Sequence, residues 1–370
     1  MAPGGCHPSE IGGPPMSALA RSLEEYRDAA QEARLVYVAG DAPGISRRKT
    51  AKGFTYWGAD GSRVRDARTL NRIKALAVPP AWTNVWICGS PNGHIQAIGW
   101  DQKGRKQYRY HARFREVRDE AKFDHMLSFA EGLPGLREKV RRDMAARGLG
   151  RDKVLATVVN LLETTMIRVG NSAYARDNKS FGLTTLHNRH VQVKGDALMF
   201  QFKGKSGKEW RVDVRNRRLA RIIRSCQELP GQHLFQYLDD DGERQAVSSA
   251  DVNAYLKAAA DRDITAKDFR TWWGTVHAAE ALAACQPFES EIQANRLLVG
   301  AVDQVAGKLG NTRAVCRKCY IHPEVIGAFL EKDLALDVAE PPEGLSTEEM
   351  AVLSLLKRRL GRMQSANDPA

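Results

Sequence analysis

The sequence predicts an α+β protein: a small β-rich N-terminal domain, followed by a mainly α domain that contains a three-stranded sheet. From Gly53 to about Arg115 the apolar residues occur in short runs separated by turn signals, which is typical of antiparallel strands. After about Arg118 they recur at helical spacing, as in KVLATVVNLLETTMIRVGN. The chain has 370 residues, of which 43% are hydrophobic, so it is long enough to hold two or three domains with cores.

The order of these patterns divides the chain into four parts. Residues 1–45 are expected to be an extension, in which a Pro/Gly-rich leader precedes a charged helix (SALARSLEEYRDAAQEARL) and a linker (GDAPGISRRKT). Residues 46–118 would form the β-rich domain and residues 119–335 the mainly α domain. Residues 336–370 would form a second linker and a terminal helix, set apart by a Pro-Pro pair.

In the β-rich domain, the segment GFTYWGADGSRV predicts two strands around the Asp60-Gly61 turn. The segments VWICGS and HIQAIGWD predict a hairpin around PNG, and KQYRYHARF follows it. In the larger domain, the first apolar helix is expected to end at Arg168. HVQVKGDALMFQFKGKSGKEWRVDV then predicts three strands joined by two turns.

Three later helices carry capping signals. Thr265 and Asp268 are spaced to cap the helix TAKDFRTWWGTVHAAEALAA. Gly310 is the expected C-cap of ANRLLVGAVDQVAGKLGN. Ser346 and Glu349 are spaced to cap the terminal helix STEEMAVLSLLKRRLGRM.

The net positive charge of the chain comes entirely from the β-rich domain. Residues 46–118 contain sixteen lysines and arginines against four acidic residues, which accounts for the whole net charge of +12. Aromatic residues lie between these cations: Tyr56, Trp57, Trp82, Trp86, Trp100, Tyr108 and Tyr110. Such a local excess predicts binding to a polyanion, and it favours nucleic acid over an anionic membrane surface.

Several protein classes are not expected. No apolar run approaches the roughly eighteen residues that a membrane span requires. The first residues lack a charged region followed by an apolar one, so we expect no secretory signal. Four of the six cysteines are widely scattered, which indicates a reducing cytoplasm rather than a disulfide framework.

The run LGNTRAVCRKCYIHPEV combines two cysteines, a tyrosine and a histidine. A structural zinc site needs four ligands, whereas Cys316, Cys319 and His322 supply at most three and no second pair exists elsewhere. A redox Cys-x-x-Cys normally follows a strand, whereas a helix precedes this pair. We therefore expect no metal, and we expect the cysteines to pack a short helix that presents Tyr320.

Cationic residues at the ends of elements are candidates for chemistry on a phosphodiester, which needs charge neutralisation and a proton for the leaving oxygen. Arg168 lies at the expected helix end, and Lys205 lies in the turn GKSGK. Arg270 lies in the first turn of a capped helix, and Asn311 follows Gly310. Spacing alone does not prove that these residues converge.

Five segments, in this order along the chain, resemble the type IB DNA topoisomerases of the poxvirus–bacterial kind: MIRVGN, GLTTLHNRHVQ, FKGKSGKEW, KDFRTWWG and LGNT…CRKCY. The resemblance covers about residues 47–330, including GRKQYRYH in the β-rich domain. It implies a two-domain clamp around duplex DNA. It also implies relaxation of supercoils by a monomer without ATP, metal or another cofactor, in the cytoplasm at the nucleoid.

The resemblance implies a role for each candidate. Tyr320 would be the nucleophile that forms a 3′-phosphotyrosyl link, and Arg168 and Arg270 would bind the non-bridging oxygens. Lys205 would be the general acid, and Lys267 an accessory cation on the same helical face as Arg270. In the β-rich domain the expected DNA contacts are Arg105, Lys106, Gln107, Tyr108 and Tyr110.

One position departs from the family pattern, because Asn311 occurs where many relatives have histidine. An asparagine can donate a hydrogen bond but cannot carry charge. Two alternatives remain open: a tyrosine site-specific recombinase, and a non-catalytic DNA-binding protein on the same scaffold. The spacing Lys267-x-x-Arg270 favours the topoisomerase, because recombinases typically have histidine at the first of these two positions.

Overall fold

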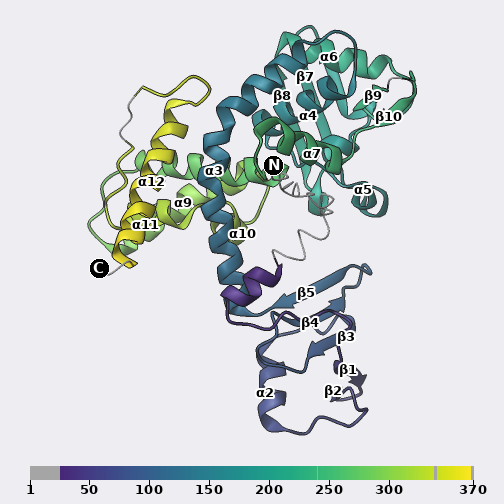
Figure 1. Ribbon diagram of the computed structural model, residues 1–370, viewed down its shortest axis with the longest axis vertical. Coiled ribbons are helices and arrows are strands. Elements are labelled where there is room, and N and C mark those ends of the chain that lie inside the picture. Colours follow the sequence, from purple (N-terminus) through teal and green to yellow (C-terminus); the bar gives the residue numbers. More distant parts are fainter. Residues whose placement is uncertain (1–25, 240, 337–339, 368–370) are drawn as a thin grey trace, which may run out of the picture. The chain divides into compact units, whose positions relative to one another are not determined.

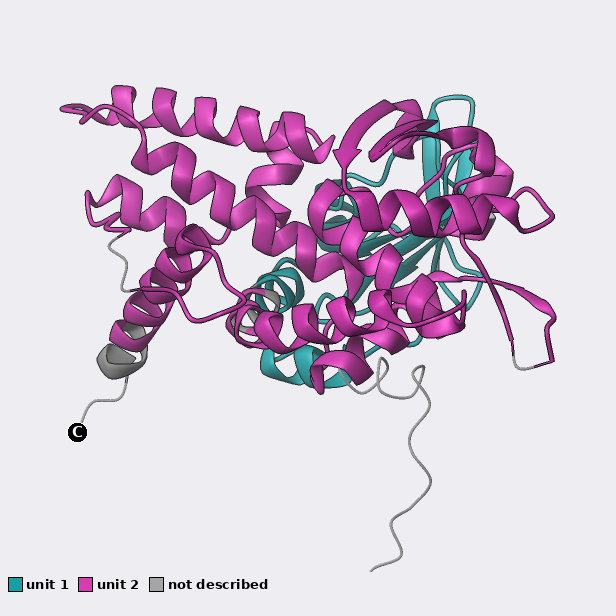
Figure 2. Cartoon of the chain, turned by 90° about the horizontal axis from the view of Figure 1, so that it is seen from above, with its two compact units in different colours: residues 1–122 teal, residues 123–370 magenta. Residues whose placement is uncertain are grey.

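The computed structural model describes residues 26–239, 241–336 and 340–367 (Figure 1). The chain divides into two compact units, Met1–Lys122 and Phe123–Ala370, which Figure 2 shows in separate colours. Each unit combines helices with antiparallel strands, so the predicted α+β class is confirmed. The leader and the first part of the predicted N-terminal helix lie outside the described residues.

The first unit contains a five-stranded antiparallel sheet in the order β2-β1-β3-β4-β5. Its strands are β1 Gly44–Thr50, β2 Gly53–Trp57, β3 Thr83–Cys88, β4 Ile95–Trp100 and β5 Lys106–Tyr110. Ile87 of β3 pairs with Ala97 of β4 and neither side chain is exposed, so the predicted hairpin is confirmed. Ile73 of helix α2 (Ala67–Ala75) covers this core together with Ile45.

Two expectations for this unit are wrong, and one helix was not expected. The segment expected to be a linker contains strand β1. Ile45 is the only buried residue of this strand, so its mainly polar sequence did not predict a strand. The Asp60-Gly61 turn is followed by one bridge, Trp57 to Arg63, instead of a strand. Helix α2 was not expected.

A small aromatic cluster lies at the start of helix α3 (Ala112–Ala145). Phe114 packs there against Ala29 and Ala30 of a helix over residues 26–32, and against Leu35. These residues belong to the segment 1–45, which was expected to be an extension. In the structure they contribute to the core of the first unit.

The second unit surrounds one apolar helix, α4 (Arg151–Thr165). Its residues from Val154 to Val159 are all buried, as expected for a helix that other elements cover on every side. The remaining elements are α5 Ser172–Asn178, β6 Val191–Lys194, β7 Ala197–Lys203, β8 Glu209–Arg215, α6 Arg217–Glu228, β9 Gln236–Leu238, β10 Arg244–Ala246, α7 Ser249–Ala260, α8 Ala266–Ala283, α9 Glu291–Leu309, α10 Arg313–Cys319, α11 Pro323–Leu330 and α12 Thr347–Asn367. The three predicted strands form the sheet β6-β7-β8.

The three predicted capping sites are confirmed. Asp268 accepts hydrogen bonds from both the backbone and the hydroxyl of Thr265 at the start of α8. Gly310 ends α9 with φ of 64°. Ser346 and Glu349 bond each other reciprocally at the start of α12.

Helix α12 is not set apart from the second unit. Its residues Val352, Leu353, Leu355 and Leu356 are buried in the common core, and the helix packs against α8 and α11. Within the described residues, no helix is both long and apolar enough to cross a membrane.

Candidate active site

Residues from four separate parts of the second unit line one cavity of about 300 Å³. Its lining includes Arg168, Lys205, Lys267, Arg270 and Tyr320. The fold therefore brings together residues that lie up to 152 positions apart in the sequence. Asn311 contacts this group through Arg168.

Arg270 is the most enclosed cation of the cavity, with 4% of its surface exposed. Its Nη1 donates to the carbonyl of Met166, and its Nη2 donates to the carbonyl of Leu309 at 2.7 Å. Both carbonyls lie at C-terminal ends of helices, where the helix dipole favours a cation. Burial, and then repulsion by Arg168, lower the pKa of Arg270 to about 10, so its guanidinium remains charged at neutral pH.

The prediction that the first apolar helix ends at Arg168 is wrong. Helix α4 ends at Thr165, and Met166 turns the chain through a left-handed conformation with φ of 56°. The carbonyl of Arg168 then accepts from Leu183 N–H at 2.9 Å. A Cβ atom at Gly182 would lie 2.5 Å from that carbonyl oxygen, so only glycine permits this approach.

The phenol of Tyr320 lies beside both arginines. Burial lowers the pKa of Arg168, and hydrogen bonding and charge interaction with Tyr320 act in the opposite direction. Tyr320 contributes in the same way to the pKa of Arg270, whose guanidinium carbon lies 5.3 Å from the centre of the Tyr320 ring. The nucleophile candidate and the two phosphate-binding candidates are therefore immediate neighbours.

Helix α8 supports the backbone of Tyr320 as well as carrying Arg270. A Cβ atom at Gly274 would lie 2.5 Å from the carbonyl oxygen of Tyr320, so the two backbones touch. Thr275 Oγ1 lies 3.4 Å from the same carbonyl and accepts from His322 N–H at 3.1 Å. Sequence reasoning missed Gly274 and Thr275. Their only signal is the spacing of about one helical turn after Arg270.

Lys205 lies in the turn between β7 and β8, with an exposed side chain that lines the cavity. The same turn packs against the segment that carries Asn311. Trp210 lies between Gly204 and Gly310, and a Cβ atom at either glycine would come within 2.8 Å of its ring.

Asn311 has a fixed orientation. Its Oδ1 accepts from Arg168 Nη2 at 2.5 Å, and an arginine can only donate, so the amide oxygen must face Arg168. The Nδ2 group is buried and has no hydrogen-bond partner within the described residues. The side chain therefore has a free donor next to the two arginines.

Cys316 and His322, which the sequence analysis weighed and rejected as metal ligands, make structural contacts. Cys316 is fully buried in the core. His322 Nδ1 accepts from Glu324 N–H at 3.1 Å, and its ring packs against Phe123. No group of three metal-ligating side chains occurs in the part of the chain that the structure describes.

The five expected DNA contacts of the first unit lie together on and just before β5. Arg105 pairs with Asp101, and Gln107 donates to the same carboxylate at 3.1 Å. Lys106 Nζ lies 5.7 Å from the ring centre of Tyr108, which is 42% exposed. Tyr110 stacks against Phe114 at 5.4 Å and is half-buried in the aromatic cluster.

Comparison with known proteins matches both units. Residues 111–337 match the model of the catalytic core of eukaryotic DNA topoisomerase I, and residues 53–101 match that of the N-terminal domain of bacterial DNA topoisomerase IB. DNA topoisomerase 1B of Acanthamoeba polyphaga mimivirus is 33% identical over 285 residues, which cover 75% of this chain and 85% of that protein. DNA topoisomerase 1B of Vaccinia virus (strain Copenhagen) is 22% identical over 248 residues, 65% of this chain and 74% of that protein.

Proposed function

Since this chain belongs to the type IB DNA topoisomerases, we propose that it relaxes supercoiled duplex DNA by cutting and resealing one strand through Tyr320. The observation that carries this proposal is the placement of the Tyr320 phenol beside Arg168 and Arg270. A phosphodiester that enters the cavity would meet two guanidinium groups on its non-bridging oxygens, next to the attacking oxygen. Such fixed charges stabilise the transition state more than the ground state.

In the proposed reaction, Tyr320 Oη forms a bond to phosphorus as the bond between phosphorus and the 5′ oxygen breaks. The phenol proton passes to solvent, and the Lys205 ammonium donates a proton to the departing 5′ oxygen. The Asn311 amide donates from Nδ2 to a phosphate oxygen, and Lys267 supplies a further positive charge. Religation reverses these steps, with neutral Lys205 taking the proton of the 5′ hydroxyl.

The covalent link would preserve the energy of the phosphodiester, so the cycle needs neither ATP nor a metal ion. We assign DNA binding to residues 46–118, including Arg105, Lys106, Gln107, Tyr108 and Tyr110, and the chemistry to residues 119–335. We further propose that the protein acts as a monomer in the cytoplasm, on the DNA of the nucleoid. Sedimentation with and without a short duplex tests the monomer.

The proposal is tested by incubating negatively supercoiled plasmid with the protein in EDTA and without ATP. The wild type is expected to relax the plasmid and to leave a protein–DNA adduct when the reaction is stopped with detergent. Tyr320→Phe is expected to bind DNA and to do neither, because it lacks the attacking oxygen.

Tyr174→Phe is the matched control, because Tyr174 lines the same cavity and loses the same atom. It is expected still to form the adduct. Relaxation by Tyr320→Phe would refute the proposed nucleophile. DNA binding by the wild type without any adduct would favour the non-catalytic alternative.

A further inference from the structure

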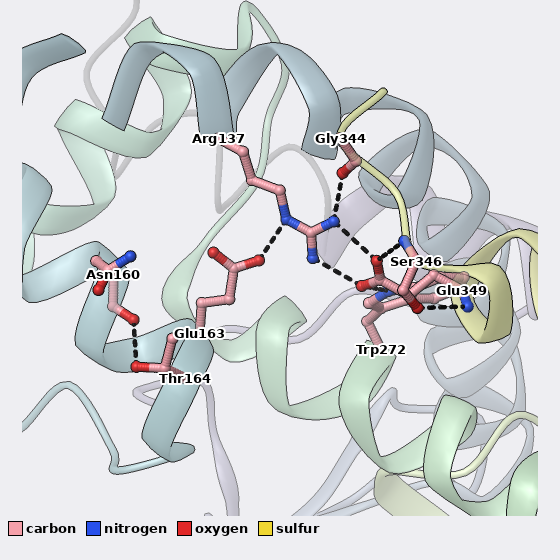
Figure 3. A network of polar contacts seen from close by, with 8 residues as sticks. All are labelled: Arg137, Asn160, Glu163, Thr164, Trp272, Gly344, Ser346 and Glu349. Atoms are coloured by element: carbon pink, nitrogen blue, oxygen red, sulfur yellow. Dashed lines mark hydrogen bonds and ion pairs between the residues drawn. The ribbon is translucent and has the colours of Figure 1, made fainter. Parts of the chain in front are cut away.

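A polar network joins four helices of the second unit (Figure 3). Arg137 of α3 lies at its centre, between Glu163 of α4 and Glu349 of α12. Trp272 of α8 completes the network through its indole N–H. Helix α12 begins after residue 337, where the family match ends.

The carboxylate of Glu349 accepts four hydrogen bonds. Its two oxygens accept from Arg137 Nη2 at 2.7 Å and Nη1 at 2.8 Å. They also accept from Trp272 Nε1 at 3.1 Å and from Ser346 N–H at 2.9 Å. A bidentate arginine–carboxylate pair with two more donors has a fixed geometry, unlike an ordinary surface ion pair.

The contact with Trp272 fixes the rotation of α8. Residues two apart in an α-helix point about 200° from each other, so Trp272 and Arg270 lie on opposite faces. Trp272 is 3% exposed and is held from behind by Glu349, while Arg270 faces the cavity. Lys267 is exposed on a long flexible chain, whereas Arg270 is buried and depends more closely on its backbone.

The contact with Glu163 fixes the end of α4. Arg137 Nε donates to Glu163 Oε1 at 2.6 Å. Glu163 lies three residues before Met166, the residue whose carbonyl holds Arg270 Nη1. The network therefore supports both the helix that carries Arg270 and the carbonyl that orients its guanidinium.

We propose that Glu349, held by Arg137, is a positioning residue for Arg270, so that helix α12 completes the active site from behind. This inference rests on the proposed function. Loss of the Glu349 charge would misplace the Arg270 guanidinium, and errors of about 1 Å in such groups cost up to about 10²-fold in rate.

The test uses Glu349→Gln in the full chain. Single-turnover adduct formation on saturating duplex is expected to slow by about 10-fold or more. DNA affinity, measured in a Tyr320→Phe background, is expected to stay the same, because Glu349 does not line the cavity. Weaker binding at an unchanged rate would overturn the proposal.

A double-mutant cycle shows whether Glu349 acts through Arg270. In an Arg270→Ala background, Glu349→Gln is expected to cause little further slowing, because the group that it positions is absent. Equal slowing in both backgrounds would mean a general structural effect and would overturn the proposal. Failure of the proposed function is recognised separately, by adduct formation in Tyr320→Phe.

Two controls separate positioning from stability. Glu348→Gln removes the same charge from the same helical turn without touching Arg137 or Trp272, and it is expected to leave the rate unchanged. Val352→Ala weakens the packing of α12, and it is expected to lower the melting temperature without the same loss of rate. If Glu349→Gln does not fold, Trp272→Phe removes the indole N–H and tests the same contact. An unchanged adduct rate in Trp272→Phe would then overturn the proposal.

Discussion

Gly274 is the point at which helix α8 touches the backbone of Tyr320. Gly274→Ala would place a methyl group 2.5 Å from the Tyr320 carbonyl, so the tyrosine must move. We expect the rate of adduct formation to fall by about 10²-fold, while the fold persists. Stopped single-turnover assays measure the rate, and circular dichroism checks the fold.

Gly300→Ala is the control for this prediction, because a Cβ atom there meets nothing within 4 Å on α9. That variant is expected to keep its rate and to gain about 0.5–1 kcal/mol of helix stability. An unchanged rate in Gly274→Ala would mean that the reaction does not depend on the close contact between Gly274 and the Tyr320 backbone.

Lys205 is expected to affect the rate of cleavage only when the leaving oxygen needs a proton. Lys205→Ala should slow cleavage of an ordinary strand by about 10²–10⁴-fold. A strand with sulfur in place of the bridging 5′ oxygen should restore most of the rate, because a thiolate leaves without protonation. Lys208→Ala removes a lysine from the same hairpin and is the control, for which no comparable loss of cleavage rate is expected. A sulfur substrate that gives no recovery would assign Lys205 another role.

Asn311 should donate a hydrogen bond in the reaction, but it should not make the cleavage rate depend on pH. Asn311→Ala is expected to slow cleavage by about 10-fold or more, because it removes the free Nδ2 donor. Asn311→His should add a rise in rate as the pH falls below the imidazole pKa, near 6.5 in its unperturbed form. Rate–pH profiles of the three proteins test this. An unchanged profile and rate in both variants would remove Asn311 from the site.

Among the elements, the turn before β6 contains His190, a histidine whose protonation should destabilise the fold. Burial, followed by repulsion from His187 and Arg189, lowers the pKa of His190 to about 4. The unfolded chain binds this proton more readily, so the stability contributed by neutral His190 is complete above pH 6.5 and is lost as the pH falls towards 4.

His190→Asn preserves an acceptor for His187 N–H and removes this titration. Its free energy of unfolding should fall less steeply than that of the wild type over this pH range. Urea titrations at a series of pH values measure both slopes. Equal slopes would show that His190 titrates alike in the folded and unfolded chains.

Elements were predictable from the sequence where local signals agreed with burial. Helix α8 has a cap, its partner and a continuous apolar pattern, and all three were correct. Strand β1 has one fully buried residue and three consecutive basic ones, so its pairing depends on neighbours that a local pattern does not reveal. The exit of α4 was misjudged because Met166, which is not a glycine, adopts the left-handed conformation.

In the whole molecule, charge and chemistry are divided between different parts of the sequence. The net charge of +12 comes from residues 46–118, whereas the cavity lies in the second unit. The motifs identified five residues that line the cavity, but not the contacts of Gly274 with Tyr320 or of Glu349 with Arg137 and Trp272. The capping signal of Glu349 gave no indication of these long-range partners.

DNA affinity should therefore depend on charges that the chemistry does not use. Lys49→Gln with Lys52→Gln removes two exposed cations at the β1–β2 turn. The slope of log affinity against log salt should fall by about 2, while the adduct rate on saturating duplex stays the same. Lys257→Gln, which breaks an ion pair in the second unit, is the control. An unchanged slope would exclude these two lysines from the DNA contact.

The position of Glu349 in the chain has a consequence for protein synthesis. Tyr320 is made before Glu349, and so are Arg168 and Arg270. A chain that is still being translated, or that stops before α12, would contain the nucleophile and both arginines without the support behind them. By the same argument, such incomplete products would cut DNA about 10-fold or more slowly than the complete chain.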